Sequence, residues 1–333
     1  MPSPRDSQRI VIAGASSLLG AELKSLLEES RFAGWDLSLV DEETAAGTLT
    51  EAGGEPAVIQ PVEEGTFSRA KLIFFAGSEA FTHRNLAAAR ESGATVIDLS
   101  GAALNVPDAK VWFAIDDVGQ HADKSKTLYA IPSAPGLAAA KLLAALSNAG
   151  LSRLALIFFR PVSEAGRAGI EELETQTSQL LSFQSTGQPV FDTQVAFNLL
   201  DHYGAASREN LQSIRARIRG EVSFAAGSNV VKPSVQVLHA PVFYGYTFVA
   251  MAELNPQQSK DALIEASRKV GFTLDSDAAS PLGNLNASGD SAIHLALPEN
   301  DSAHPGAWWF WGAADNIRVP AATALKLAEK LLE

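Results

Sequence analysis

The stretch that decides the fold is RIVIAGASSLLG, residues 9–20. The apolar run Arg9–Ala13 predicts a short buried strand, and Leu18–Leu27 predicts a helix directly after it. Between them, the small residues from Gly14 to Gly20 let the backbone turn tightly and aim the N–H groups of the helix start at an anion. This arrangement is typical of a dinucleotide-binding loop.

The loop departs from the usual glycine spacing. It reads G-x-x-x-x-x-G and not G-x-G-x-x-G, and the Cβ of Ser17 would crowd a pyrophosphate more than glycine would. Asp41 lies about 20 residues after Gly20, where a carboxylate accepts a ribose 2′-OH and repels a 2′-phosphate, which favours NAD over NADP. Alternatively, the glycines only allow packing, and Asp41 lies in a solvated loop with Glu42 and Glu43. Both interpretations stay open.

Further strands and helices alternate through the first third of the chain. Strands are expected at Leu37–Val40, Ala57–Pro61, Leu72–Phe75 and Thr95–Asp98, with a helix at Thr82–Ser92. Such βαβ alternation predicts an α/β, doubly wound (Rossmann) domain on a parallel sheet.

The pattern changes beyond Tyr129, and a second domain is expected to begin near Ala134. Here we expect helices at Gly136–Ala149 and Gly166–Leu181, a strand at Leu154–Arg160, two antiparallel-like strands at Ser234–His239 and Thr247–Leu254, and a last helix at Val319–Leu332. The run Trp308–Trp311 is interpreted as a buried strand, and the alternating Arg215, Arg217 and Arg219 as a solvated face.

Composition excludes several classes of function. The 333 residues contain 26 Lys+Arg against 38 Asp+Glu, a formal charge of −12, without a basic cluster, which argues against a nucleic-acid partner. No apolar run reaches the length of a membrane span, and the polar start Met1–Gln8 lacks a signal-peptide pattern, so a cytoplasmic location is expected. The six histidines show no metal-ligand spacing, and no metal is expected.

The sequence contains no cysteine. A disulfide, a thiolate metal site and a cysteine nucleophile are therefore all excluded.

Seven motifs in order along the chain carry a resemblance to the aspartate-semialdehyde dehydrogenase family. They are GASSLLG (14–20), FFAGS (74–78), VIDLS (96–100), GIEEL (169–173), QVAFN (194–198), APVFYG (240–245) and ADNIR (314–318). The sequence resembles the cysteine-less Usg-type paralogues of this family most closely, because HAPVFYG at residues 239–245 matches them better than it matches the enzymes.

The resemblance implies a fold and an assembly. It implies a Rossmann dinucleotide-binding domain at residues 1–133 completed by a C-terminal helix at 318–333, and an α/β semialdehyde-dehydrogenase-type dimerisation domain at 134–317. It also implies a homodimer, with a small-molecule or nucleotide ligand. The expected cofactor-binding residues are Gly14, Ser16, Ser17, Leu18, Gly20, Asp41 and Gly77.

The family's chemistry needs a cysteine at a helix start, where the helix lowers the thiol pKa and the thiolate attacks the aldehyde. In this sequence that position falls on Ala134, in AIPSAPG at residues 130–136. Neither the thiohemiacetal nor the thioester of the family's reaction can form on a methyl side chain.

The other family positions have changed as well. Arg160 replaces the glutamine that orients the acyl intermediate, His239 replaces the arginine that grips the substrate carboxylate, and Tyr246 replaces the acid/base histidine. An imidazole cannot reproduce the guanidinium fork, and a phenol is a poor base at neutral pH. The phosphate-binding arginine falls on Leu104 and a substrate-facing lysine on Gln212, so only Glu209 is kept.

Three hypotheses follow. In the first, the chain is a degenerate family member that keeps a dimeric scaffold and a nucleotide pocket. In the second, it is an NAD-dependent oxidoreductase with altered chemistry, in which Tyr246 is the acid and Arg160 polarises the substrate. In the third, it is a structural partner of an active paralogue. Ser133 is interpreted as a helix N-cap and not as a nucleophile, because a serine needs an adjacent base and no histidine except His239 lies at a matched position. The changed site is interpreted as filled by bulky side chains, with a redesigned ligand site as the alternative.

Overall fold

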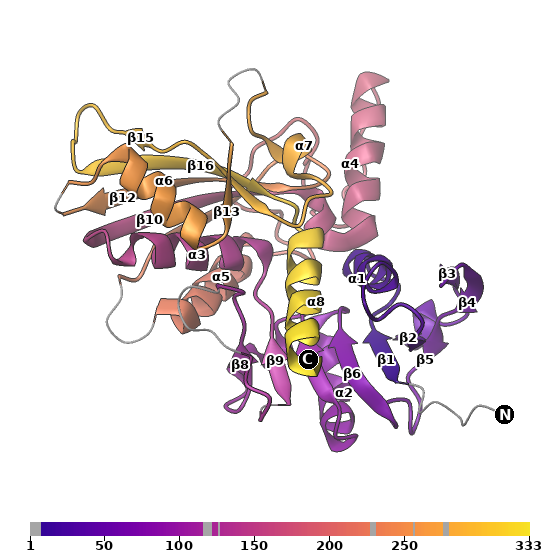
Figure 1. The fold of residues 1–333 in the computed structure, drawn as a ribbon. Helices are drawn as coiled ribbons and strands as arrows, with labels where there is room; N and C mark the ends of the chain where they lie inside the picture. Colours follow the sequence, from indigo (N-terminus) through magenta and orange to yellow (C-terminus); the bar gives the residue numbers. More distant parts are fainter. Residues whose placement is uncertain (1–7, 116–121, 126, 227–230, 256, 276–279) are drawn as a thin grey trace. The chain divides into compact units, whose positions relative to one another are not determined.

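The computed structural model describes residues 8–115, 122–125, 127–226, 231–255, 257–275 and 280–333. These residues form two compact units (Figure 1). The first unit contains the described parts of Met1–Ala114 and His121–Pro132, together with Pro320–Glu333. The second contains those of Ile115–Gln120 and Ser133–Val319. Residues 1–7, which belong to the polar start without a signal-peptide pattern, lie outside the described residues.

A parallel sheet forms the centre of the first unit. Its order is β5-β2-β1-β6-β7-β9-β8, and every neighbouring pair is parallel. The strands are β1 (Arg9–Ala13), β2 (Asp36–Asp41), β5 (Gln60–Pro61), β6 (Ala70–Phe75), β7 (Thr95–Asp98), β8 (Lys110–Val111) and β9 (Leu128–Ala130). The doubly wound arrangement predicted from the sequence is confirmed.

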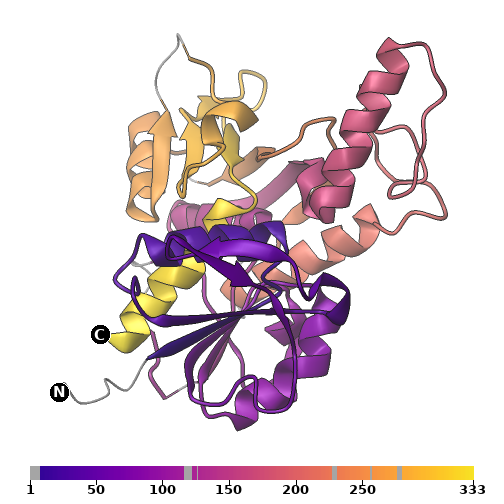
Figure 2. The same ribbon diagram turned by 90° about the vertical axis from the view of Figure 1, so that its right-hand side faces the viewer.

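Helices cover both faces of this sheet, as Figure 2 shows. Alternate residues of β1 point to opposite faces. Ile10 and Ile12 belong to a core with α1 (Leu18–Glu28) and α8 (Arg318–Leu332). Val11 and Ala13 belong to the other core, with α2 (Glu79–Glu91). The C-terminal helix therefore completes the N-terminal unit.

One predicted strand of the first unit divides in two. The expected strand Ala57–Pro61 ends at Val58 as part of β4 (Glu55–Val58), which pairs with β3 (Leu49–Ala52) in a hairpin. Residues after Ile59 form β5 and pair with β2. The hairpin turns at Gly53 and Gly54, both at positive φ, a conformation that glycine adopts without steric cost.

The second unit contains a mixed sheet with the order β11-β10-β12-β16-β14-β13, and β15 pairs with β16. The strands are β10 (Leu151–Arg160), β11 (Ser234–His239), β12 (Tyr246–Leu254), β13 (Phe272–Asp275), β14 (Ile293–Ala296), β15 (Glu299–Asn300) and β16 (Ala307–Ala314). The helices are α3 (Ala134–Ser147), α4 (Gly166–Leu181), α5 (Leu211–Ala226), α6 (Lys260–Lys269) and α7 (Asn284–Ala287).

Two sequence expectations for this sheet need correction. Strand β11 is parallel to β10 and not antiparallel, because α4 and α5 lie in the connection and return the chain to the same end of the sheet. The strand β16 is buried on one face only. Trp308 and Phe310 point into the core, whereas Trp309 and Trp311 are 42% and 36% exposed.

Candidate functional site

Two glycines of the predicted cofactor loop are required by packing. Gly14 has a φ of +95°, and a Cβ there would lie 2.1 Å from the backbone nitrogen of Gly77. A Cβ at Gly20 would lie 2.3 Å from the carbonyl oxygen of Gly14. Both glycines are therefore needed for packing, and this need is compatible with nucleotide binding.

The serines and Asp41 hold the loop in place. The backbone N–H and the hydroxyl of Ser16 donate to Oδ2 of Asp41, at 2.8 and 2.6 Å. The N–H of Glu42 donates to its Oδ1 at 2.7 Å. Asp41 lies at the end of β2 as predicted, but a ribose hydroxyl would have to share oxygens that already bind the chain.

The start of α1 can hold an anion. Ser17 is its N-cap, where Oγ accepts from the N–H of Gly20 and donates to the carbonyl oxygen of Ala76, both at 2.8 Å. In the described hydrogen bonds of this loop, the first-turn N–H groups of Leu18 and Leu19 have no acceptor, as expected for a helix start. These two donors fit a pyrophosphate.

A cavity of about 550 Å³ lies beside the end of β2. Its lining is acidic, and its only cation, Arg84, bonds Oε1 of Glu42 at 2.7 Å. The lining residues are Asp41, Glu42, Glu43, Thr44, Pro61, Val62, Glu63, Phe81, Arg84 and Asn85.

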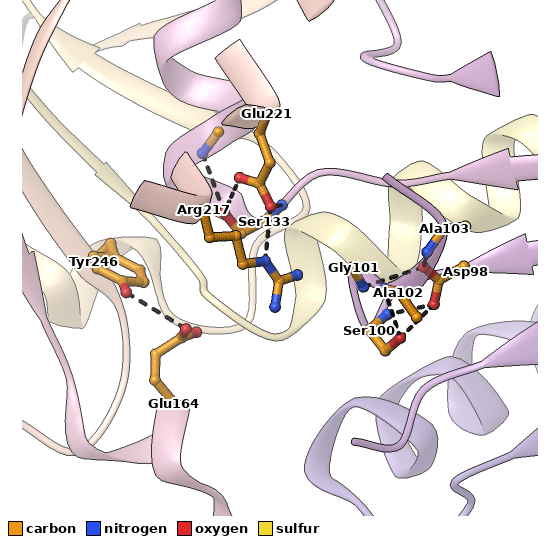
Figure 3. Close-up of polar contacts among 11 residues, drawn as sticks. Asp98, Ser100, Gly101, Ala102, Ala103, Ser133, Glu164, Arg217, Glu221 and Tyr246 are labelled. Atoms are coloured by element: carbon orange, nitrogen blue, oxygen red, sulfur yellow. Dashed lines mark hydrogen bonds and ion pairs between the residues drawn. The ribbon is translucent and has the colours of Figure 1, made fainter. Parts of the chain in front are cut away.

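The loop after β7 is held together by a buried carboxylate. Buried Asp98 organises this loop, because it accepts from the N–H groups of Ser100, Gly101 and Ala103 and from the hydroxyl of Ser100, at 2.6–3.2 Å (Figure 3). Leu104, where we expected the family's phosphate-binding position, is 8% exposed and belongs to the apolar core around α2. This side chain is therefore part of the core.

The first residue of α3 carries a methyl group, at the position where the family resemblance led us to expect the nucleophile. Ala134 is the first helical residue and 2% exposed. Ser133 is the N-cap, as predicted, and its Oγ accepts from the N–H of Gly136. The same hydroxyl donates to Oε2 of Glu221 at 2.6 Å, so a carboxylate that the sequence did not indicate lies beside Ser133 (Figure 3).

The arginines of α5 form a face that is only partly solvated. Arg219 is exposed, as expected, whereas Arg215 and Arg217 are half-buried. Arg217 donates from Nε to Oε1 of Glu221 at 3.1 Å. Arg215 donates to the side chain of Gln236 at 2.5 Å, and Arg219 to the carbonyl oxygen of Val235 at 2.9 Å. These bonds exist because α5 packs against β11. Gln212, on the same helix, is exposed.

Arg160 and His239 belong to one buried hydrogen-bonded chain. Arg160 donates to the phenol oxygen of Tyr203 at 3.1 Å and to Oε2 of Glu209 at 2.6 Å. Tyr203 lies 3.3 Å from Nδ1 of His239, and Nε2 of His239 lies 3.3 Å from the carbonyl oxygen of Val195. Because that carbonyl only accepts, Nε2 carries the proton and Nδ1 accepts from Tyr203.

Burial sets the charge states in this chain. It lowers the pKa of His239 to about 4, although the hydrogen bond to Val195 opposes it, so the imidazole is neutral at pH 7. Burial also lowers the pKa of Arg160, but its electrostatic interactions, with Tyr203 first and Glu209 also contributing, outweigh burial and raise it. Arg160 is charged and already paired, and His239 is uncharged.

Tyr246 faces a carboxyl group. Its hydroxyl donates to Oε2 of Glu164 at 3.4 Å, and Nδ2 of Asn316 donates to Oε1 at 3.0 Å. Burial first, and then the charge of Glu164, raises the pKa of Tyr246 well above its ordinary value. Burial also raises the pKa of Glu164, against the opposing charge of Arg160. Tyr246 is therefore a neutral phenol and not a base at pH 7.

The structure thus brings Arg160, His239 and Glu209 into one cluster, with Tyr246 close enough to Arg160 to affect its pKa. Sequence reasoning missed Glu221, Glu164 and Tyr203. Only Glu221 has a local signal, because Arg217 precedes it by four residues on a helix, a spacing at which opposite charges pair.

Among the described residues, no group of three or more histidine, cysteine, aspartate or glutamate residues could hold a metal ion. His121 lies outside them. No helix in the described part of the chain is long and apolar enough to cross a membrane.

The parallel sheet, its glycine loop and the mixed-sheet unit define a class of protein, one with a Rossmann nucleotide-binding unit and a separate α/β unit. A family model described as semialdehyde dehydrogenase, NAD binding domain, matches residues 9–134, and another, semialdehyde dehydrogenase, dimerisation domain, matches residues 142–319. The chain belongs to the semialdehyde dehydrogenase family.

Individual relatives match over nearly their whole length. The chain is 28% identical to a USG-1 protein homolog of Pseudomonas aeruginosa over 97% of both chains. It is 26% identical, over the same shares, to aspartate-semialdehyde dehydrogenase 2 of Vibrio cholerae. The solved structure of a probable aspartate-semialdehyde dehydrogenase from Pseudomonas aeruginosa superposes with a TM-score of 0.86, at 28% identity and 98% coverage of each chain. The predicted family resemblance is confirmed.

Proposed function

We propose that this chain is a semialdehyde dehydrogenase family member that does not turn over aspartate semialdehyde and instead acts as a dimeric nucleotide-binding protein. The observation that carries the proposal is the buried methyl group of Ala134 at the first position of α3. No acyl-enzyme bond can form there, and the sequence has no cysteine elsewhere to replace it.

The surrounding groups support loss of substrate recognition as well as loss of chemistry. Arg160 and Glu209 neutralise each other, and His239 is held neutral. A charged substrate group would have to break one of these contacts, and truncating one partner of a buried charge pair costs several kcal/mol. The same contacts weigh against the altered-chemistry hypothesis, which needs Arg160 free to polarise a substrate.

The test is direct turnover of aspartate semialdehyde. The purified chain should show no more phosphate-dependent oxidation with NAD or NADP than a heat-treated sample does. The Vibrio cholerae relative, tested alongside, establishes that the assay works. Turnover by this chain that scales with protein concentration would contradict the proposal.

For the nucleotide, we propose NAD over NADP. A nicotinamide nucleotide supplies hydride chemistry when bound. The residues described here bear only on how its adenosine end would be bound. The cavity beside β2 has four carboxylates and one arginine, and Glu42 pairs with that arginine. A 2′-phosphate would be repelled there, whereas a ribose hydroxyl would not.

Calorimetric titration with NAD, NADP and 5′-AMP tests this preference. NAD and 5′-AMP should bind, and NADP should bind at least about tenfold more weakly, a difference of about 1.4 kcal/mol. Glu42→Gln should reduce the difference in affinity between NAD and NADP, because it frees Arg84 for the 2′-phosphate. The control Glu43→Gln removes one carboxylate of the same cavity without freeing Arg84, so it should reduce this difference less. Equal binding of NAD and NADP would reject the preference, and absence of binding by all three would reject nucleotide binding.

For assembly, we propose a homodimer through the exposed face of the mixed sheet. The family match assigns residues 142–319 to a dimerisation domain. Ile157, Trp309 and Trp311 are exposed on this sheet although they are large and apolar. Val249 pairs with both Ile157 and Trp311, so these side chains lie on neighbouring strands. A second copy of the chain would cover them. Mixed dimers with an active relative remain the alternative, which mass measurement after co-expression would reveal.

A further inference from the structure

The start of α3 favours a nearby negative charge, and a side chain of the same unit provides one. A helix N-terminus presents unpaired N–H groups and a partial positive charge, which favour a nearby anion. In this position the family's reaction places a thiolate. Here the residue is Ala134, and the nearby anion is supplied by α5 of the same unit.

Glu221 is that anion, and it is firmly held. Its side chain is fully buried. It accepts from the backbone N–H of Ser133 at 3.1 Å, from the hydroxyl of Ser133 at 2.6 Å and from Nε of Arg217 at 3.1 Å (Figure 3). Three donors therefore converge on this one buried carboxylate and fix its position beside the helix start.

The first turn of α3 is shaped around this carboxylate. A Cβ at Gly136 would lie 2.2 Å from Oε2 of Glu221, a distance that real atoms do not allow. Only glycine leaves room for the carboxylate at this point of the helix. The glycine, the serine cap and the arginine therefore form one built arrangement with Glu221 on both sides of position 134.

We propose that Glu221 is a fixed internal anion that takes the place of the reacting anion at the start of α3, so that position 134 disfavours a second negative charge. Glu221 is thus a positioning residue that acts through the electrostatics of the helix start. Restoring a cysteine at position 134 would then restore the sulfur but not its thiolate. The inference concerns unit 2 alone and does not depend on nucleotide binding.

The test is the ionisation of a cysteine introduced by Ala134→Cys. Because the sequence has no other cysteine, the ultraviolet absorbance of the thiolate reports this residue alone, and no reagent has to reach a buried site. In the single variant, the thiol pKa should be at or above the ordinary value of about 8.5. Adding Glu221→Gln should lower the thiol pKa by at least about one unit. The competing carboxylate is then gone, while the helix start and Arg217 still stabilise the thiolate.

Two further variants keep the test decisive. Ala134→Cys with Arg217→Gln should raise the thiol pKa above that of the single variant. Because the side chain of Arg217 is 35% exposed, this variant is informative even if the Glu221 variant does not fold. Ala134→Cys with Glu172→Gln removes another buried carboxyl group, on α4, and should leave the thiol pKa unchanged. A lowered thiol pKa in the single variant, or one that neither Glu221→Gln nor Arg217→Gln moves, overturns the proposal.

Discussion

At the residue scale, His239 shows how a changed family position acquires a structural role. Its ring accepts from Tyr203 on one side and donates to the carbonyl oxygen of Val195 on the other. A protonated ring would donate from both nitrogens, which would oppose the hydrogen bond from Tyr203 and place a second charge near Arg160. The neutral form is therefore part of the folded state.

This predicts a loss of stability in mild acid. The unfolded chain binds a proton on this imidazole below about pH 6.5, whereas the folded protein does so only near pH 4. The free energy of unfolding should therefore fall as the pH drops through this window, by about 2 kcal/mol between pH 7 and pH 5 from this group. Urea unfolding at the two pH values, followed by tryptophan fluorescence, measures it.

The matched comparison uses two glutamine variants. His239→Gln should reduce the loss between the two pH values, whereas His304→Gln, at an exposed position of the same unit, should not. If both variants lose as much stability in acid as the parent, His239 is not the group responsible.

The individual residues of the site were only partly predictable. The changed family positions could be identified because each stands inside a quoted motif. Their partners could not, because Ser133 and Glu221 are 88 residues apart and Arg160 and Tyr203 are 43 apart. Such contacts depend on which helix packs against which strand, and no local pattern encodes that.

At the scale of elements, the turn from β1 to α1 depends on two glycines in direct contact. Gly14 approaches Gly77 so closely that a Cβ at Gly14 would overlap the backbone of Gly77, whereas a Cβ at Gly77 would lie in tight contact with Gly14, at 3.2 Å. The carbonyl oxygen of Ala13 accepts from the N–H of Ala76 at 2.8 Å, which fixes this approach. The loop therefore needs small residues even before any ligand is considered.

Two alanine variants separate backbone strain from packing. Gly34 has a φ of +87° and open space around its Cα, so Gly34→Ala should cost only the left-handed conformation, about 1 kcal/mol. Gly14→Ala has the same strain and also a steric overlap, and it should cost at least about 2 kcal/mol more. Thermal and urea unfolding of both variants measure the difference. Similar losses in the two variants would show that the contact with Gly77 relaxes easily.

Element positions were more predictable than contacts. The bounds of β1, α4 and β11 match the expected residues, because apolar spacing and glycine punctuation mark them. The hairpin of β3 and β4 was missed because its strands are partly polar and mostly exposed, so they show no buried face. The direction of β11 was missed because strand direction follows from the connection and not from the strand's own residues.

At the scale of the whole molecule, the exposed apolar face of the mixed sheet is the surface through which we propose that the chain dimerises. Phe159 and Trp311 have ring centroids 6.4 Å apart, so the face is continuous across strands. An interface that covers it would have the apolar centre found in stable homodimers.

A charge in this face should dissociate the dimer. Ile157→Glu should shift the mass measured by analytical ultracentrifugation from dimer to monomer, because a carboxylate would be buried unpaired at the interface. Leu49→Glu, which introduces the same charge at an exposed leucine of the β3 hairpin, should leave the mass unchanged. A parent protein that is monomeric at all concentrations would remove the basis of the assembly proposal.

The C-terminal helix has a consequence for how the chain is made. Ala321, Ala324, Leu327, Ala328 and Leu331 of α8 complete the core around Ile10 and Leu72. Domains generally fold from the N-terminus during synthesis. Here the N-terminal unit cannot cover this core until α8 leaves the ribosome, whereas the second unit is already complete in sequence at Val319. A ribosome that stops before α8 therefore releases a chain whose N-terminal core is open on one face.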